Sequence, residues 1–243
     1  MRASNKPQDP GAPGFPVVAG EFGAVVAGLW HGSLGRTVRC VPTRRTVAAP
    51  FGGGFVFGKW RVGQRAMAAA EWHWLHVLPM LGLATPQPLA FVGRGRRTLL
   101  VTGGVGGRAL DAWWRKLQPE GRGGAVAEYA IAHVAPRVRA LHGAGVCYRD
   151  LYWNHVFAAD PCGTEPPTFL DVERVFRPRW RLRRWIVKDL AGLLASAPDD
   201  VPVRLQLRFL RAYLDAPVRG HRGLLRAIVG KAARIRRHAP RFG

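Results

Sequence analysis

The chain has 243 residues, of which 48% are hydrophobic, so it can bury a substantial core and is not a wholly disordered protein. Its 37 Lys and Arg residues against 15 Asp and Glu residues give a formal charge of +22. Such a charge implies contact with nucleic acid, anionic lipid or a phosphorylated glycan, unless the many arginines reflect the codon bias of a GC-rich genome.

The first part of the chain is predicted to be rich in strands. Residues 1–16, with many Pro and Gly, are expected to form a flexible tail. The patterns that follow predict two strands, a helix that stops at Pro79, and a hairpin. Their ranges are 37–41 and 55–60 for the strands, 66–78 for the helix, and 89–92 with 98–101 for the hairpin.

The second part is predicted to be mainly helical. The glycine-rich residues 103–107 mark the expected boundary, and helices follow from Leu110 and over 125–141, 183–196, 203–214 and 223–237. The helix over 125–141 has an apolar stripe at Val126, Tyr129, Ala130, Val134 and Leu141, with Pro136 as an expected kink. The fold class is therefore α+β and bilobal. Residues 17–102 form a nucleotide-binding N-lobe, with a small sheet and one helix, and residues 103–243 form a larger helical C-lobe.

No segment is predicted to cross a membrane. The most apolar early segment, residues 17–30, is interrupted by Glu21 and is too short to span a bilayer. The N-terminus also lacks the basic-then-apolar order of a signal peptide. The cysteines Cys40, Cys147 and Cys162 have no spacing typical of a metal site or a disulfide framework, so a soluble or peripheral cytoplasmic protein is expected.

Two acidic residues have the separation that a kinase-type phosphotransferase needs. In that chemistry one Asp accepts the proton of the attacking hydroxyl, and a downstream Asp holds magnesium on the ATP phosphates. Asp150 follows a helix end and turn and is the candidate catalytic base. Asp171 follows a short strand-like run and is the candidate magnesium ligand. Asp189, in the next predicted helix, is expected to brace the backbone of the catalytic loop.

His155 and Asn154 are alternative candidates for a second metal ligand beside Asp171. Imidazole is a poor match for magnesium, so His155 has a second interpretation as a hydrogen-bonding support of the loop. Asn154, one residue earlier, supplies an oxygen ligand instead.

Lys59 and Glu71 are the candidate N-lobe residues of the active site. In kinases a strand Lys holds the α- and β-phosphates and is oriented by a helix Glu. Taken alone, the pair is more typical of a solvated Lys and a surface Glu, whereas the downstream Asp150 and Asp171 favour the active-site interpretation. Lys59 and Val101 are the candidate nucleotide-binding residues. No G-x-G-x-x-G precedes Lys59, and residues 32–35 or 52–54 are the glycine runs available to cover the phosphates.

The run over 141–155 resembles the lipopolysaccharide kinase family, the WaaP/InaA-like and Kdo-kinase group, whose catalytic loop has the form H-R-D-x-Y-x-x-H. Asp150, Tyr152 and His155 match this pattern, and Tyr148 replaces the leading His. The resemblance covers about residues 35 to 215 and implies a protein-kinase-like fold. It also implies transfer of the γ-phosphate of ATP, with Mg²⁺, to a heptose or Kdo hydroxyl of the lipopolysaccharide inner core. The expected location is the inner face of the inner membrane.

Two basic segments are candidates for contact with the acidic partner. The amphipathic segment over 223–237 suits docking on anionic lipid, or it is a packed helix with a solvated charged face. Five arginines within residues 177–184 suit a phosphorylated substrate, or they too form a solvated face.

Two other functions are possible from the sequence. One is a small-molecule or sugar phosphotransferase of the same fold. The other is a non-catalytic, kinase-like basic scaffold that binds anionic membrane or nucleic acid. A scaffold has no need of four active-site residues, namely Lys59, Glu71, Asp150 and Asp171. The sequence has no recognisable nucleic-acid-binding motif, so nucleic acid is not the expected partner.

Overall fold

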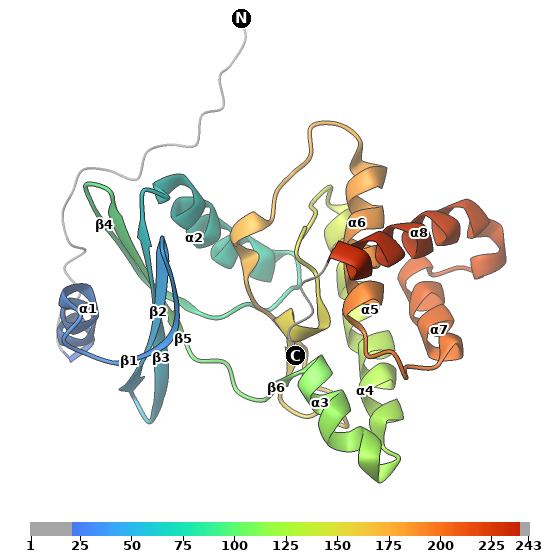
Figure 1. Cartoon of the computed structure of the whole chain (residues 1–243), viewed down its shortest axis with the longest axis horizontal. Coiled ribbons are helices and arrows are strands. Elements are labelled where there is room, and N and C mark those ends of the chain that lie inside the picture. The colour runs from blue at the N-terminus through green and yellow to red at the C-terminus, as the bar shows by residue number, and fades with distance from the viewer. Residues whose placement is uncertain (1–20, 239–243) are drawn as a thin grey trace, which may run out of the picture. The chain divides into compact units, whose positions relative to one another are not determined.

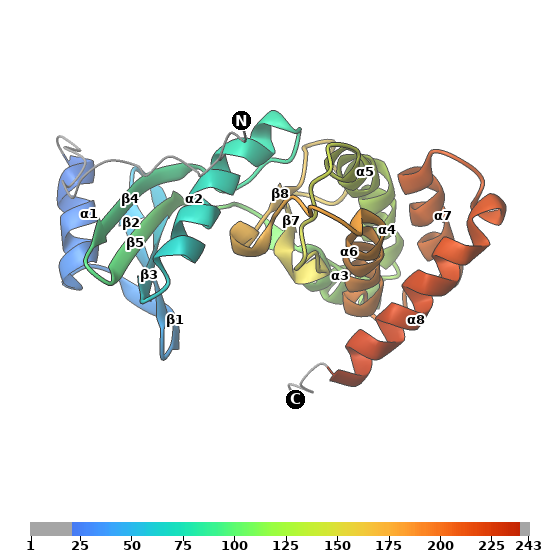
Figure 2. The same ribbon diagram turned by 90° about the horizontal axis from the view of Figure 1, so that it is seen from above.

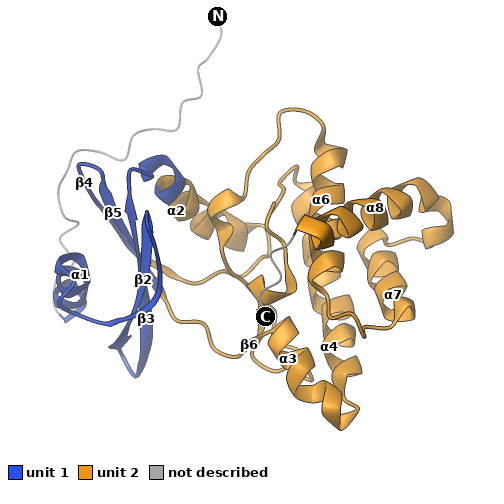
Figure 3. Cartoon of the chain, viewed as in Figure 1, with its two compact units in different colours: residues 1–68, 89–102 blue, residues 69–88, 103–243 orange. Residues whose placement is uncertain are grey.

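A computed structural model describes residues 21–238 of the chain. The predicted tail over 1–16 and residues 17–20 of the predicted N-lobe lie outside the described residues. The described residues form two compact units, coloured separately in Figure 3. The first unit comprises residues up to 68 together with 89–102, and the second comprises 69–88 together with the residues from 103 onward.

The first unit is a five-stranded sheet with one helix packed on it (Figure 1). Its strands lie in the order β1-β2-β3-β5-β4, and the β1–β2 and β2–β3 pairs are antiparallel. The helix α1 buries Val26, Leu29 and Trp30 in the same core as Val47 and Val56 of the sheet. The elements are α1 (Glu21–His31), β1 (Arg36–Val41), β2 (Arg44–Phe51), β3 (Gly54–Val62), β4 (Pro88–Arg94) and β5 (Arg97–Gly103).

The strand β2 is an element that the sequence pattern did not predict. Its charged start at Arg44 and its exposed Pro50 hide the alternation of buried Val47 and Ala49. Pro50 is tolerated because it lies one residue from the end of the strand, opposite Phe55. The helix α1 was likewise not predicted as a helix.

The glycine runs upstream of Lys59 have structural roles in the first unit. Gly52 and Gly53, with φ of +56° and +77°, form the turn between β2 and β3. Gly35 has φ of +91°, and a Cβ there would lie 2.5 Å from the Val47 side chain. Packing against β2 therefore requires a glycine at residue 35. The turn between β1 and β2, over 42–43, contains no glycine.

The helix α2 (Arg65–Met80) begins in the first unit and continues in the second. The predicted stop at Pro79 is wrong, because Pro79 lies inside the helix. Proline lacks the N–H that would bond the carbonyl of Leu75, and the Thr85 hydroxyl donates to that carbonyl at 3.1 Å instead. The helix ends at Met80, and Gly82, with φ of +80°, lies in the turn that follows.

The second unit is mainly helical, with a small sheet in the order β6-β7-β8. The predicted helix over 125–141 consists of two α-helices joined by a π-helical turn, which lies just before Pro136. Its predicted stripe is buried in full. The remaining helices and strands are β6 (Arg108–Ala109), α3 (Leu110–Leu117), η1 (Gln118–Glu120), α4 (Gly123–Tyr129), η2 (Ala130–Val134), α5 (Ala135–Gly143), η3 (Trp153–His155), β7 (Val156–Ala158), β8 (Thr168–Phe169), η4 (Val172–Arg174), α6 (Leu182–Ser196), α7 (Val203–Leu214), η5 (Val218–His221) and α8 (Arg222–His238).

The basic helix α8 lies along α6, as Figure 2 shows. Ile228 and Ala232 on its apolar face are buried, so this face packs within the protein. Arg236 donates to the carbonyls of Leu194 and Ala195 near the end of α6, at 3.0 and 3.3 Å. The structure thus supports the packed-helix interpretation of this segment. None of the helices in residues 21–238 has the length and hydropathy of a membrane span.

Candidate active site

A short hairpin in the second unit brings the end of the catalytic loop (residues 148–155) close to Asp171. The strands β7 and β8 are antiparallel, with Val156 opposite Phe169. Just beyond this pair, the Leu170 amide donates to the His155 carbonyl at 2.8 Å. The end of the catalytic loop therefore lies beside Asp171, although Asp150 and Asp171 are far apart in sequence.

Tyr148 ties the start of the catalytic loop to the residue before Asp171. Its side chain is fully buried, and its hydroxyl donates to the Leu170 carbonyl at 2.7 Å. Burial raises the pKa of this phenol well above its ordinary value, and the nearby Asp171, Asp189, Glu71 and Asp150 carboxylates raise it further. Tyr148, which stands where the family pattern has His, thus has a supporting hydrogen bond of its own.

Asp189 of α6 holds the backbone of the catalytic loop, as predicted. The side chain is 1% exposed. One carboxylate oxygen accepts from the Tyr148 amide at 2.6 Å, and the other accepts from the Arg149 amide at 2.7 Å. His142 Nε2 lies 3.2 Å from the same carboxylate. These bonds hold Arg149 at φ of +76°, a left-handed conformation that costs free energy for a residue with a Cβ.

Close packing of α6 against the catalytic loop adds to this support. A Cβ at Gly192 would lie 2.6 Å from the Leu151 carbonyl oxygen, so the helix and the loop approach as closely as glycine permits. One turn further along, the Ser196 hydroxyl accepts from the Trp153 amide at 2.9 Å. The loop is therefore positioned by a rigid helix over most of its length.

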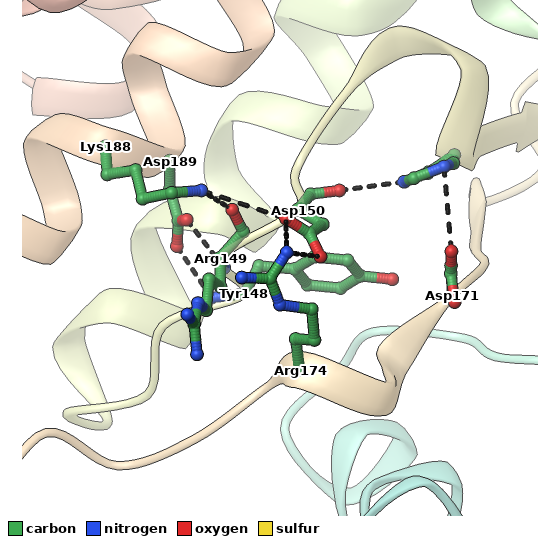
Figure 4. A network of polar contacts seen from close by, with 8 residues as sticks. Tyr148, Arg149, Asp150, Asp171, Arg174, Lys188 and Asp189 are labelled. Atoms are coloured by element: carbon green, nitrogen blue, oxygen red, sulfur yellow. Dashed lines mark hydrogen bonds and ion pairs between the residues drawn. The ribbon is translucent and has the colours of Figure 1, made fainter. Parts of the chain in front are cut away.

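The Asp150 carboxylate faces two cations that the spacing analysis did not predict (Figure 4). Arg174 Nη1 donates to both carboxylate oxygens, at 3.1 and 3.0 Å. Lys188 Nζ lies 3.8 Å from Asp150 Oδ1 and donates to the Arg149 carbonyl. Burial lowers the pKa of Lys188, although Asp150 and Asp189 favour its charged form. No spacing rule links either cation to Asp150, because the contacts depend on how η4 and α6 fold back onto the loop.

His155 lies between the catalytic loop and Asp171. Its Nδ1 lies 2.8 Å from the Asp150 carbonyl oxygen, which can only accept, so Nδ1 carries the proton and donates. Its Nε2 lies 3.9 Å from Asp171 Oδ2. Asp171 itself has φ of +62°. Asn154, the alternative ligand, is exposed.

The other predicted site residues are divided between the two units. Glu71 is buried on α2 within the second unit, near enough to the Tyr148 phenol to influence its pKa. Lys59 lies on β3 of the first unit, opposite Thr46. The Val101 side chain is 0% exposed in the core of the first unit. The second unit therefore brings together Glu71, Asp150, His155 and Asp171 by itself.

Comparisons with known proteins show which family the chain belongs to. The model of the lipopolysaccharide kinase (Kdo/WaaP) family matches residues 59–213. The lipopolysaccharide core heptose(I) kinase WaaP of Escherichia coli K12 is 28% identical to the chain, over 90% of the chain and 97% of the relative. A second Escherichia coli protein of that name is 29% identical, over 86% and 94%.

Solved structures give the same result for the fold. A structure of WaaP in complex with acyl carrier protein superposes with a TM-score of 0.72 at 26% identity, and covers 90% of this chain and 98% of that one. A type VIII aminoglycoside-3'-phosphotransferase superposes with a TM-score of 0.57 at 20% identity, over 86% and 97%. The predicted α+β, protein-kinase-like fold is confirmed. Because the family model matches well over half of its length, the chain belongs to the lipopolysaccharide kinase (Kdo/WaaP) family.

Proposed function

We propose that the chain is an ATP-dependent kinase that transfers the γ-phosphate to a heptose or Kdo hydroxyl of the lipopolysaccharide inner core. The observation that carries this proposal is the juxtaposition of Asp150, His155 and Asp171 on a rigidly held loop and hairpin. The names of the Escherichia coli relatives support the choice of acceptor.

Each acidic residue has a separate role in the proposed transfer. Asp150 accepts the proton of the sugar hydroxyl as the hydroxyl oxygen attacks the γ-phosphorus. Arg174 bonds both oxygens of this carboxylate, so the incoming hydroxyl takes the place of at least one of these contacts. Lys59 has the proposed role of the lysine that holds the ATP phosphates, and Glu71 has that of the helix glutamate. Val101 also binds the nucleotide in this proposal.

The residues beside the hairpin suit a magnesium ion. Asp171 supplies the hard oxygen ligand that the ion prefers, and its Oδ2 lies 3.9 Å from His155 Nε2. Bound there, Mg²⁺ would neutralise charge on the ATP phosphates. Asp171 is the primary ligand in this proposal, and His155 or Asn154 completes or supports the site.

Thermal unfolding tests the cofactors. ATP with Mg²⁺ should raise the melting temperature of the wild type, since ligands that bind the folded state stabilise it. ATP with EDTA, or Asp171→Asn with ATP and Mg²⁺, should give a much smaller rise. An equal rise in all three samples would exclude Asp171 as the ligand, and no rise at saturating ATP would favour the scaffold function.

An acceptor assay tests the proposed reaction. Purified protein with Mg²⁺ and labelled ATP is given lipopolysaccharide core lacking the phosphate, or a panel of aminoglycosides and free sugars. We expect label in the lipopolysaccharide, and mass analysis of the product should locate the phosphate on heptose or Kdo. Transfer to a soluble compound alone would instead support a small-molecule phosphotransferase, and Asp150→Ala provides the blank.

We propose that the protein acts at the inner face of the inner membrane. Two features of the second unit, an arginine-rich segment and an apolar cavity, suit partners there. The segment over 177–184 has five exposed arginines around Trp180, which is 72% exposed. An apolar cavity of about 350 Å³ lies between α6, α7 and α8 and suits an acyl chain of an acyl carrier protein, the partner in the solved WaaP complex. Co-sedimentation with anionic but not neutral vesicles, and co-elution with acyl carrier protein, would test these partners. Failure of both in low salt would exclude them.

A further inference from the structure

The catalytic loop does not supply a cation to Asp150 from its own residues. Arg149 is the one Lys or Arg within residues 148–155. Its guanidinium lies 5.7 Å from the centre of the Trp185 ring, and Figure 4 shows its side chain directed away from Asp150. Phosphoryl transfer depends on fixed positive charge around the reacting oxygens. The charge next to Asp150 therefore comes from other elements, in the form of Arg174 and Lys188.

Lys188 is held in place independently of Asp150. It precedes Asp189 on α6, and its ammonium donates to the Arg149 carbonyl while Asp189 accepts from the Arg149 amide. Two neighbouring residues of one helix thus hold both sides of Arg149. The Lys188 ammonium also lies 5.9 Å from the centre of the Tyr152 ring. This anchoring positions the ammonium 3.8 Å from Asp150 Oδ1.

Arg174, unlike Lys188, is held by the Asp150 carboxylate itself. Its side chain is 39% exposed against 22% for Lys188, and its hydrogen bonds among the described residues go to the Asp150 carboxylate. An acceptor hydroxyl that binds Asp150 competes with Arg174 for those oxygens. Lys188 keeps its backbone anchor when that exchange takes place, so it remains beside the reacting atoms.

We propose that Lys188 is a catalytic residue that contacts the transferred phosphoryl group from α6. This inference rests on the proposed kinase function and adds a residue to it. The acceptor oxygen forms its bond to the γ-phosphorus and its proton passes to Asp150. The bond from the γ-phosphorus to the bridging oxygen breaks and leaves ADP. Lys188 remains protonated throughout and stabilises the negative charge on the phosphoryl oxygens.

The surroundings of Lys188 make its charge sensitive to pH. Burial lowers its pKa, and Arg174 and Arg149 act in the same direction, whereas Asp150 and Asp189 oppose them. Tyr152 faces it through its ring. Transfer should therefore decline on the alkaline side as the ammonium loses its proton. Arg at this position would stay charged, because a guanidinium is not deprotonated in proteins.

The test compares Lys188→Met and Lys188→Arg in the full chain, with Lys116→Met on the exposed face of α3 as the control. Lys188→Met should lower kcat by about 100-fold or more, as loss of one preorganised donor does elsewhere. Its KM for ATP should change by less than about threefold, because the contact forms in the transition state. Lys188→Arg should recover part of kcat and lose the alkaline decline of the wild type. Lys116→Met should match the wild type.

Two results would overturn the proposal. One is a Lys188→Met kcat within about threefold of the wild type. The other, decisive if Lys188→Met does not fold, is an alkaline decline in the transfer rate that persists unchanged in Lys188→Arg.

Slow ATP hydrolysis, measured without acceptor, separates the proposed role of Lys188 from the proposed lipopolysaccharide acceptor. Wild-type hydrolysis without transfer to lipopolysaccharide would reject the acceptor, while the same variants still test Lys188.

Discussion

Asp150→Ala should lower the rate of phosphoryl transfer by about 10²–10⁴-fold while the protein remains folded. The carboxylate is the candidate base for the acceptor hydroxyl, and its position depends on backbone contacts that the substitution leaves intact. His155 bonds the Asp150 carbonyl, and Asp189 bonds the two preceding amides. The loss should therefore appear in kcat, with little change in the KM for ATP.

Steady-state kinetics and thermal unfolding together check this prediction. Asp150→Asn preserves the shape of the side chain and should be nearly as inactive, because an amide is a poor proton acceptor. Asp199→Asn is a suitable control, since the Asp199 side chain is 92% exposed. Undiminished turnover in Asp150→Ala would contradict both the role of Asp150 and the proposed mechanism.

Asp189→Ala should lower the free energy of unfolding by about 2–5 kcal/mol, because two backbone amides lose their acceptor at about 1–3 kcal/mol each. The substitution leaves the buried Tyr148 amide without its acceptor and removes the acceptor of the Arg149 amide. His142 loses a partner as well and keeps its contact with the Tyr213 hydroxyl at 2.9 Å. Arg149 then has less to hold it in the left-handed region, so activity should fall together with stability.

Urea unfolding of the wild type and the variant measures this difference. Asp189→Asn keeps the volume but places an amide N–H₂ opposite a backbone donor, so it should also be destabilised, by a smaller amount. Asp199→Ala, at an exposed position, should change the free energy of unfolding by no more than about 0.5 kcal/mol. A loss below about 1 kcal/mol in Asp189→Ala would show that the loop is held by other contacts.

The predicted helices and strands agree with the structure where the local sequence pattern is strong. They differ from it where tertiary contacts decide the secondary structure. The helices over 183–196 and 203–214 agree with α6 and α7 to within one residue, because apolar side chains recur at helical spacing. The strand β2 was missed since its pairing with β3, rather than its composition, makes it a strand. Pro79 stays helical because the hydroxyl of Thr85, beyond the end of the helix, donates to the carbonyl that proline leaves free.

Motif spacing and periodicity are local properties, so the family, the α+β class and the candidate residues Lys59, Glu71, Asp150 and Asp171 could be predicted without a structure. The roles of these residues remain predictions. Which groups meet depends on the tertiary fold: His155 rather than Asn154 lies beside Asp171, and Lys188 and Arg174 contact Asp150. These contacts form because α6 and η4 fold back onto the catalytic loop through long-range packing, which no spacing rule in one sequence encodes.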